Sequence, residues 1–460
     1  QGKKELFEGL AMERLEKDWV KYPILHLDLN ISQYSSQKDL EDILNRNLVA
    51  WENLYGADPA ERSLALRFAG IIQRACEKTG QRVVILVDEY DKPLLQNLHD
   101  EAMQTELRNM LKPFYGVLKT MDGCIKFALL TGVTKFGKVS VFSDLNNLMD
   151  ISMDDRYVEI CGITEEEIHT YLEKELQGLA SRQKVSYEEM CLELKKRYDG
   201  YHFVENSIGM YNPFSLLNAL TDSKLNSYWF GSGTPTYLIE MLNKYHVKPQ
   251  QIGARKVLAE SFDAPTERMV DITPLLYQSG YITIKDYSSL TNLYTLDIPN
   301  KEVRMGLMKS LLPNYLHQYT ADGLTTVALL FEAIAGERMD DALRLLQTFL
   351  STIPQCDNTD YEGHYQSLLY TIFSLLGMYV DVEVRTPKGR VDMVMRTPTT
   401  LYVVELKLNK TADIALEQIN LRNYPERFAL CGLPIVKVGI NFESERHTLG
   451  DWVIEGSMSC

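Results

Sequence analysis

The chain has 460 residues, of which 45 % are hydrophobic and 24 % charged, and its formal net charge is −15. It contains no apolar run of about 18 residues and no signal-peptide core, which argues against a membrane-spanning or secreted protein. Its 7 cysteines are scattered without a C-x-x-C pair, so a zinc site or disulfide framework is not expected and a reducing cytoplasm fits.

The length suggests about three domains. The acidic balance argues against a general nucleic-acid coat protein, but it leaves room for a nuclease whose basic groups are local.

The first part of the chain alternates helix and strand patterns. We expect a helix over Lys3–Trp19, with Leu6, Leu10 and Leu15 on one face, and a strand over Tyr22–Asn30. Two more helices are predicted, over Gln37–Tyr55 and Glu61–Thr79, and Gly80 closes the second.

A continuous apolar run, Val83–Val87, ends in Asp88 and Glu89. Such a run predicts a buried parallel strand, and adjacent acids at its end are typical of the Walker B strand of P-loop NTPases. Asp88 would hold Mg²⁺ through water, and Glu89 would polarise the water that attacks the γ-phosphate. The alternative is a strand that runs out into an acidic turn.

No phosphate loop accompanies this strand. The nearest match, Gly132–Val139 (GVTKFGKV), has Val139 where a Mg²⁺-binding hydroxyl is needed, and it follows the acidic strand instead of preceding it. We therefore assign Gly132–Ser140 to a loop. The strand Ile125–Leu130 ends at Thr131, the position where AAA-type ATPases place a polar sensor.

The middle of the chain is predicted to be mainly helical. Tyr157–Gly162 has the pattern of a last sheet strand, and Thr164 with Glu167 forms a capping box. The pattern of Asp271–Ile298 predicts a short helix followed by a hairpin, as in a winged-helix module. Such modules often bind DNA, but the acidic residues of this one favour a role in packing. The best linker candidate is Ile353–Asp360. The other predicted elements are Glu188–Tyr198, Pro213–Leu220, Thr236–Lys244, Tyr281–Lys285, Leu293–Leu296, Val303–Tyr319 and Leu324–Thr352.

A charged hairpin lies near the C-terminus. It is predicted to consist of two strands, Arg390–Met395 and Leu401–Leu408. The first strand contains Asp392, and the second contains Glu405 and Lys407. Glu405 and Lys407 are two residues apart and leave the same face, and the hairpin can place Asp392 beside Glu405. Buried carboxylates are costly unless something binds them, and Mg²⁺ held by two carboxylates would offset that cost. The alternative is a set of solvated charges on an open sheet face.

Further elements complete an α/β unit around the hairpin: the helices Tyr361–Leu376 and Ala412–Leu421 and the strands Val380–Arg385 and Pro434–Gly439. Arg385, Lys388 and Arg390 cluster before Asp392, where they could grip phosphates or simply form a solvated loop.

This C-terminal arrangement resembles the PD-(D/E)xK nuclease superfamily. The resemblance implies that Asp392 and Glu405 bind Mg²⁺, that Lys407 is catalytic, and that Gln418 is the accessory glutamine of the following helix. It also implies a further Glu on the preceding helix, for which Glu362 is the candidate and Glu383 a competitor.

The whole chain resembles a family of bacterial proteins that join an AAA-ATPase-like domain to a C-terminal PD-(D/E)xK nuclease domain. The motifs VVILVDEYDKPLL, FALLTGVTKFGKVSVFSDLNNLMDIS, YDGYHF and YNPFSLLNAL carry the resemblance. In that family a Gly-Lys-Ser loop precedes the segment similar to GKKELFEGL. The resemblance thus implies that the sequence starts after this loop. We expect weak or absent nucleotide binding, with ATP and Mg²⁺ bound only if the full protein supplies the loop.

The resemblance implies a multidomain α/β protein in three parts. Residues 1–163 would form a P-loop NTPase-like (AAA-type) parallel sheet that lacks its first strand and phosphate loop. Residues 164–352 would form a helical lid with a winged-helix-like element, and residues 353–460 a restriction-endonuclease-like α/β domain.

The leading functional hypothesis is a Mg²⁺-dependent nuclease, acting on DNA in preference to RNA and coupled to the ATPase-like module. The competing hypothesis is a nucleotide-regulated switch or interaction protein whose C-terminal domain binds without cutting. A site closed by an ion pair to Lys407 or Arg390 would favour that binder. We expect a cytoplasmic protein with a nucleic-acid partner and no membrane partner, and homo-oligomerisation is open.

Overall fold

The computed structural model describes residues 2–135, 142, 145, 147–230, 236–266, 269–316, 320–351, 361–378, 381–385, 390–421, 432–446 and 448–456. The chain divides into two compact units. Unit 1 holds Gln1–Asp154 and Leu258–Gly280, and unit 2 holds Asp155–Val257 and Tyr281–Cys460. Within the described ranges, no helix has the length and apolar character needed to span a membrane.

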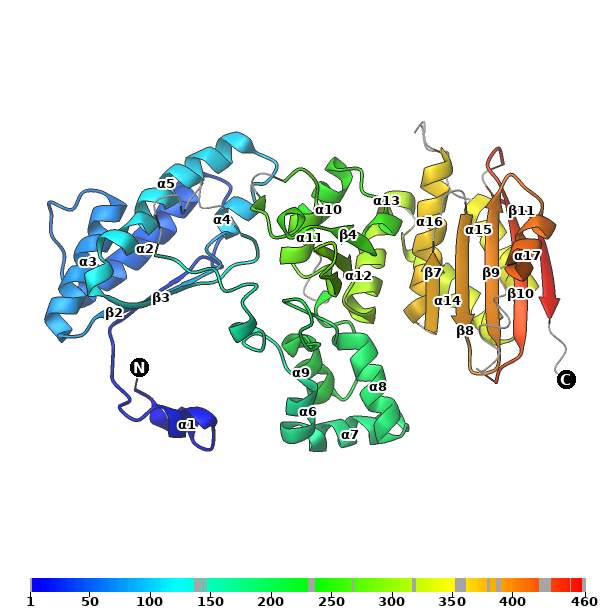
Figure 1. The fold of residues 1–460 in the computed structure, drawn as a ribbon. Coiled ribbons are helices and arrows are strands. Elements are labelled where there is room, and N and C mark those ends of the chain that lie inside the picture. Colours follow the sequence, from blue (N-terminus) through cyan, green and yellow to red (C-terminus); the bar gives the residue numbers. More distant parts are fainter. Residues whose placement is uncertain are drawn as a thin grey trace. The chain divides into compact units, whose positions relative to one another are not determined.

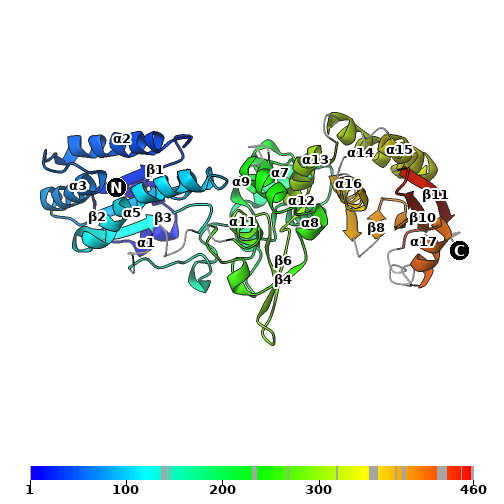
Figure 2. The ribbon, with the colours of Figure 1, turned by 90° about the horizontal axis from the view of Figure 1, so that it is seen from above.

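Unit 1 is built on a parallel sheet of β1 (Ile24–Asp28), β2 (Val83–Asp88) and β3 (Ile125–Leu130), in the order β1-β2-β3. Helices cover one face of this sheet (Figures 1 and 2). They are α2 (Gln37–Tyr55), α3 (Leu64–Thr79) and α5 (Glu101–Thr120). The shorter elements of unit 1 are η1 (Lys4–Phe7), α1 (Ala11–Leu15), α4 (Lys92–Leu95), η2 (Asp122–Cys124), η6 (Ala259–Ser261) and α11 (Thr273–Gln278).

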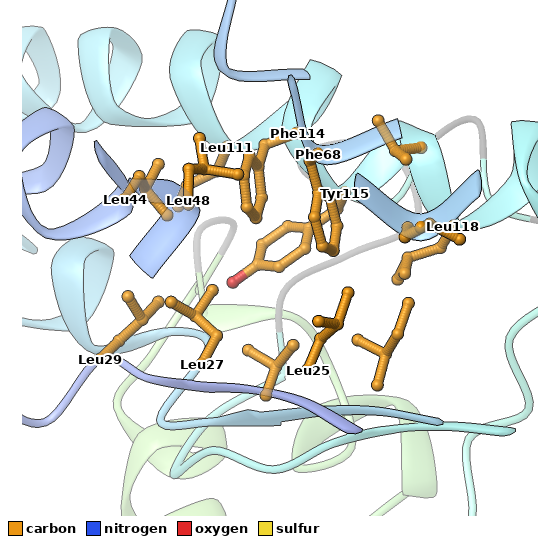
Figure 3. Close-up of a cluster of buried hydrophobic side chains, with 14 of the residues drawn as sticks. Leu25, Leu27, Leu29, Leu44, Leu48, Phe68, Leu111, Phe114, Tyr115 and Leu118 are labelled. Atoms are coloured by element: carbon orange, nitrogen blue, oxygen red, sulfur yellow. The ribbon is translucent and has the colours of Figure 1, made fainter. Parts of the chain in front are cut away.

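The core of unit 1 lies between that sheet face and the helices (Figure 3). Leu25 and Leu27 alternate along β1 toward the helices, where Phe68 of α3 and Phe114 of α5 stack with ring centroids 4.5 Å apart. Burial of such side chains is the main source of folding free energy. On the edge strand β3, Phe127 and Leu129 are 53 % and 37 % exposed.

Capping explains where two of these helices begin and end. Ser36 and Asp39 form a reciprocal capping box at the start of α2. Gly80 ends α3 in the left-handed conformation, at φ 65°, as the sequence predicted.

The predicted helix over Lys3–Trp19 is wrong in extent. Only η1 and the five-residue α1 form, because Leu6, Leu10 and Leu15 are exposed and pack into none of the cores of the described residues. Short helices are marginal without such packing.

The predicted strand over Tyr157–Gly162 is also wrong. η3 (Asp155–Tyr157) and turns occupy this stretch, and Ile160 is 65 % exposed. An alternating apolar pattern does not form a strand unless a neighbouring strand accepts and donates the hydrogen bonds of its backbone N–H and C=O groups.

The first half of unit 2 is helical, with a core formed by α6, α7, α8 and α9. Thr164 and Glu167 form the predicted capping box of α6. The elements are α6 (Glu165–Tyr171), α7 (Glu173–Gln183), α8 (Tyr187–Tyr198), α9 (Pro213–Asp222), α10 (Thr236–Lys244) and η5 (Pro249–Gln251).

The motifs YDGYHF and YNPF pack together in this region. The backbone N–H of Asn212 donates to the carbonyl oxygen of Tyr198 at 3.0 Å, and the Asn212 side chain caps α9 by accepting from Ser215 N at 3.1 Å. Both motifs therefore have a structural role here.

Unit 2 also holds a small antiparallel sheet in the order β4-β6-β5, in which β4 precedes α11 and the other two strands follow it. It joins β4 (Arg255–Val257), β5 (Thr283–Ser288) and β6 (Leu293–Asp297). The predicted helix and hairpin are thus present, with one additional strand. Four helices then follow: α12 (Lys301–Leu311), α13 (Pro313–Leu316), α14 (Thr320–Ala335) and α15 (Met339–Ser351).

The C-terminal sheet has the order β11-β10-β9-β8-β7, with β9 and β10 parallel and the other pairs antiparallel. Its elements are α16 (Tyr361–Leu375), η8 (Leu376–Met378), β7 (Asp381–Arg385), β8 (Arg390–Arg396), β9 (Leu401–Leu408), α17 (Ala412–Leu421), β10 (Ile435–Glu443) and β11 (Thr448–Gly456).

Both faces of this sheet carry helices: α17 lies on one face, and α14 and α15 lie on the other (Figure 2). Val404 packs on that second face with Leu346 of α15 and Phe373 of α16. The linker candidate Ile353–Asp360 lies outside the described residues. The domain boundaries at residues 163 and 352 remain predictions.

Candidate active site

The structure brings Asp392 and Glu405 together. They are direct partners across the antiparallel pair β8–β9, so their side chains leave the same face of the sheet. Asp392 is 6 % exposed and Glu405 1 %. Two carboxylates thus lie side by side in a region that excludes water, where ionised groups are costly unless they are compensated.

Lys407 lies on the same face, one alternation further along β9. It is 5 % exposed, and its Nζ forms an ion pair with Oε1 of Glu405. The alternative of solvated charges on an open face is wrong, because all three side chains are buried.

The strand holds these charges because its other face is apolar. Val404 and Leu406 alternate with Glu405 and Lys407 and are fully buried. Shifting β9 by one residue would move its charges into that apolar layer, so the register is strongly specified.

Helix α17 lies on the same face as the charged side chains. Gly439 of β10 pairs with Glu405, and a Cβ at residue 439 would lie 2.4 Å from the carbonyl oxygen of Ala412 and 2.8 Å from the amide nitrogen of Leu416. Glycine is therefore required for the start of α17 to approach the sheet beside Glu405. Gln418 lies on this helix and is half-buried.

The structure leaves two candidates for the further acid. Glu362 lies in the first turn of α16, and its side chain is outside the described part of the chain. Glu383 pairs with Val394 on β7–β8, two positions along β8 from Asp392, so it lies on the face of the site and at its exposed margin.

The donor chemistry fits a hard divalent cation. Among the described residues, no group of three or more His, Cys, Asp or Glu side chains is placed to hold a metal. A cation at Asp392 and Glu405 would also take water and substrate oxygens as ligands. Mg²⁺ is usually bound in this way, through one or two carboxylates.

A second polar cluster lies at the carboxyl ends of the strands of unit 1. The hydroxyl of Thr131 donates to Oδ1 of Asp88 at 2.7 Å, so the sensor-like residue contacts the acid that ends β2. Asp28 of β1 pairs in register with Asp88. The carboxyl end of a parallel sheet is where nucleotides bind in open α/β folds.

Glu89 has an unusual backbone and environment. Its φ is 56°, in the left-handed region that few non-glycine residues adopt, and the residue is half-buried. Burial first, and then the charges of Asp91 and Asp88, raise the pKa of its carboxyl. Perturbed carboxyls of this kind gather at functional sites.

Asp91 is a residue that the sequence did not single out. It is fully buried and accepts hydrogen bonds from the backbone N–H groups of Val133 and Thr134, at 3.1 and 2.6 Å, and from the Thr134 hydroxyl. A Cβ at Gly132 would lie 2.3 Å from Asp91 Oδ1. Asp91 thus holds the start of the loop after Thr131, and an acid three residues beyond Asp88 was the available signal.

The fold and the two clusters define two parts of the protein, a P-loop NTPase-like part at the N-terminus and a restriction-endonuclease-like part at the C-terminus, with a mainly helical region between them in sequence. Comparison with family models agrees with this division. Residues 1–142 match the model of a predicted AAA-ATPase, and residues 360–452 match the PD-(D/E)XK nuclease superfamily.

A full-length relative extends the comparison. An uncharacterized protein encoded in the vnfD 5′ region of Azotobacter chroococcum mcd 1 is 32 % identical over 467 residues, which cover 99 % of this chain and 87 % of that protein. The chain belongs to the family that joins an AAA-ATPase-like domain to a C-terminal PD-(D/E)XK nuclease superfamily domain. No solved structure matches the chain significantly.

Proposed function

We propose that the chain is a Mg²⁺-dependent nuclease that hydrolyses phosphodiester bonds, in DNA in preference to RNA. The observation that carries the proposal is the burial of Asp392, Glu405 and Lys407 on one face of the C-terminal sheet, with the two carboxylates directly opposite each other. The match to the PD-(D/E)XK nuclease superfamily supports it.

Each residue has a role in this proposal. Asp392 and Glu405 would hold Mg²⁺, which when bound supplies Lewis acidity and a more acidic water molecule. Lys407 would orient the attacking water or stabilise the negative charge that develops on the phosphoryl oxygens. Gln418 would position the substrate or water from α17, and Glu362 or Glu383 would add an outer acid.

The ion pair between Lys407 and Glu405 supports a second candidate function. A site closed by its own lysine is expected of a nuclease-like domain that binds without cutting. In the nuclease, by contrast, a cation would take over the neutralisation of Glu405 and release the ammonium group toward substrate. The two functions therefore differ in whether Lys407 leaves Glu405 when a divalent cation is added.

The roles of the unit 1 residues are also proposals. Asp88 would hold Mg²⁺ of a bound nucleotide through water, Glu89 would polarise the attacking water, and Thr131 would respond to the γ-phosphate. The contact between Thr131 and Asp88 supports this assignment. For these 460 residues alone we expect little ATP hydrolysis, and measurable turnover of ATP would contradict that expectation.

A cleavage assay tests the nuclease proposal. Labelled linear duplex DNA, single-stranded DNA and RNA of one sequence are incubated with the protein in Mg²⁺ or in EDTA. Wild type should cut in Mg²⁺ only and cut DNA faster, whereas Asp392→Ala, Glu405→Ala and Lys407→Ala should lose cleavage by at least about a hundredfold.

The matched control is Lys437→Ala. Lys437 of β10 lies in the same sheet, but its Nζ forms an ion pair at 2.8 Å with Glu455 of the edge strand β11 and not with a carboxylate of the site. This variant should cut like wild type. Full activity in the three site variants would refute the assignment, and binding of nucleic acid without any cleavage by wild type would favour the second function.

A further inference from the structure

The chain that joins Lys407 to α17 is held by a polar clamp. Asn409 adopts the left-handed conformation, at φ 52°, and its backbone N–H donates to the carbonyl oxygen of Phe442 at 2.8 Å. Its side chain exchanges hydrogen bonds with Ser444, whose N–H donates to Asn409 Oδ1 at 2.9 Å. The turn is therefore tied to the end of β10 immediately after the lysine.

Two further residues, Asn441 and Asp451, complete the clamp. Asn441 Oδ1 accepts from the backbone N–H of Lys410 at 3.1 Å, and its Nδ2 donates to Asp451 Oδ1 at 2.9 Å. Asp451 Oδ2 in turn accepts from the N–H of Ala412, the first residue of α17, at 3.2 Å. The oxygen and the nitrogen of the Asn441 carboxamide thus each have a fixed partner, and this sets the orientation of the group.

A β-bulge places Asp451 within reach of α17. Ile440 pairs with Trp452 and Phe442 with Leu449, so Asn441 lies opposite two residues of β11, Gly450 and Asp451. A bulge bends one strand and redirects a side chain, and bulges are frequent beside active sites. Although desolvation acts against it, hydrogen bonding from Ala412 N and Asn441 holds the pKa of Asp451 below its ordinary value.

The clamp adjoins the candidate site at two points. Asn441 is the register partner of Lys407 across β9–β10, so both side chains leave the same face. Asp451 binds the first residue of α17, and the next turn of this helix lies over Gly439, beside Glu405.

We propose that Asn441 and Asp451 are positioning residues that fix the turn after Lys407 and the start of α17, so that Lys407 and Gln418 face one reacting phosphodiester. The proposal rests on the proposed nuclease function for the roles of Lys407 and Gln418. It adds two residues whose effect on the reaction passes through the backbone that they hold, and not through contact with substrate or metal.

A reciprocal exchange of the two side chains tests this. In Asp451→Asn, the new amide uses its oxygen for Ala412 N and turns its NH₂ toward the NH₂ of Asn441. In Asn441→Asp, two carboxylates face each other. Each single variant therefore replaces the hydrogen bond between the two side chains by a repulsive contact.

The double variant N441D/D451N restores that hydrogen bond with its direction reversed. The carboxylate at position 441 offers two acceptor oxygens, one for Lys410 N and one for the new amide at position 451. That amide donates its NH₂ to the carboxylate, and its oxygen still accepts from Ala412 N. The backbone contacts of the clamp are thus the same as in wild type.

Two readouts are measured on the full chain: hydrogen exchange of the amides in Ala412–Leu416, and kcat and KM for cleavage of single-stranded DNA in Mg²⁺. Each single variant should speed exchange and lower kcat by about tenfold, with little change in KM, because one hydrogen bond to a charged group is lost. The double variant should restore both readouts to within about twofold of wild type. The control, Glu455→Gln on the same strand, should leave both unchanged.

The outcomes separate this proposal from the proposed function. If the single variants speed exchange but keep the wild-type kcat, or if the double variant folds but does not regain kcat, the clamp only caps a helix and the positioning role is refuted while the nuclease function stands. If wild type cleaves nothing, the nuclease function fails, and the positioning role fails with it.

Discussion

At the scale of single residues, the candidate site is a costly arrangement. Asp392, Glu405 and Lys407 are all at least nine-tenths buried, and removing charges from water is expensive even when they pair. An ordinary sheet would hold apolar residues there at lower cost. This cost is the physical reason to expect a ligand, since proteins keep such groups mainly where they act.

Glu89 of unit 1 is a half-buried carboxyl whose charged form is also disfavoured, and its raised pKa predicts how stability depends on pH. Because its folded pKa is raised, its contribution to stability is present below the unfolded pKa of about 4.3 and is lost as pH rises through the folded pKa. Glu89→Gln should therefore melt at a higher temperature than wild type near neutral pH, and this gain should vanish toward about pH 4. Melting curves across that range check it.

Glu106→Gln is the control for this prediction, because Glu106 is exposed on α5 of the same unit. It should show no such pH-dependent gain. A Glu89→Gln variant that melts below wild type at neutral pH would show that the carboxylate is stabilising there.

At the scale of elements, the site depends on how closely α17 packs on the sheet. Gly439 leaves no room for a Cβ beneath Ala412 and Leu416. Gly439→Ala should therefore displace the helix, lower the free energy of unfolding by about 1–3 kcal/mol and reduce cleavage. Urea denaturation and the cleavage assay measure the two effects.

The matched substitution is Gly456→Ala, at the end of β11. No atom of the described residues lies within 4 Å of a Cβ built there, so stability and cleavage should stay at wild-type values. Equal behaviour of the two alanine variants would contradict the close approach of α17.

The sequence predicted the elements that carry the site closely. β9 and α17 have the predicted bounds, and β8 extends one residue beyond its prediction. Their strong apolar patterns and short connections make such elements locally determined. The opposition of Asp392 and Glu405 follows from a short hairpin, because its turn leaves few registers open.

Other elements depend on contacts far along the chain, and the sequence did not reveal them. β11 was not predicted, and Asp451 acquires its role only through a bulge opposite Asn441. Tyr157–Gly162 shows the opposite error, since its local pattern suits a strand but none of the described strands pairs with it. The local sequence pattern indicates the propensity of a segment to form a strand, whereas the pairing of that strand depends on which segments lie beside it in the folded protein.

At the scale of the whole molecule, unit 1 is discontinuous in sequence. It takes in Leu258–Gly280, and Lys135, just beyond Thr131, ties this segment to the rest of the unit. Lys135 forms ion pairs with Asp263 and with Asp150, the latter at 2.7 Å, and its backbone N–H donates to Gln278 Oε1 at 2.7 Å. The loop after β3 is thus joined to a segment whose chain continues into unit 2 at both ends.

Lys135→Met should remove the ion pairs of Lys135 with Asp150 and Asp263. Two carboxylates would lose their shared cation, and hydrogen exchange in Leu258–Thr266 should become about tenfold faster. Hydrogen exchange followed by mass spectrometry measures it. Lys126→Met, at an exposed position of β3, should leave that segment unchanged, and unchanged exchange in Lys135→Met would show that other contacts hold it.

The central claim is that Asp392 and Glu405 hold a divalent cation in a nuclease site. The most direct measurement is anomalous scattering from crystals of the protein grown with Mn²⁺. We expect a peak between the carboxylates of Asp392 and Glu405, with the Lys407 ammonium turned away from Glu405. The absence of a peak, with Lys407 still paired to Glu405, would contradict the claim and favour a domain that binds without cutting.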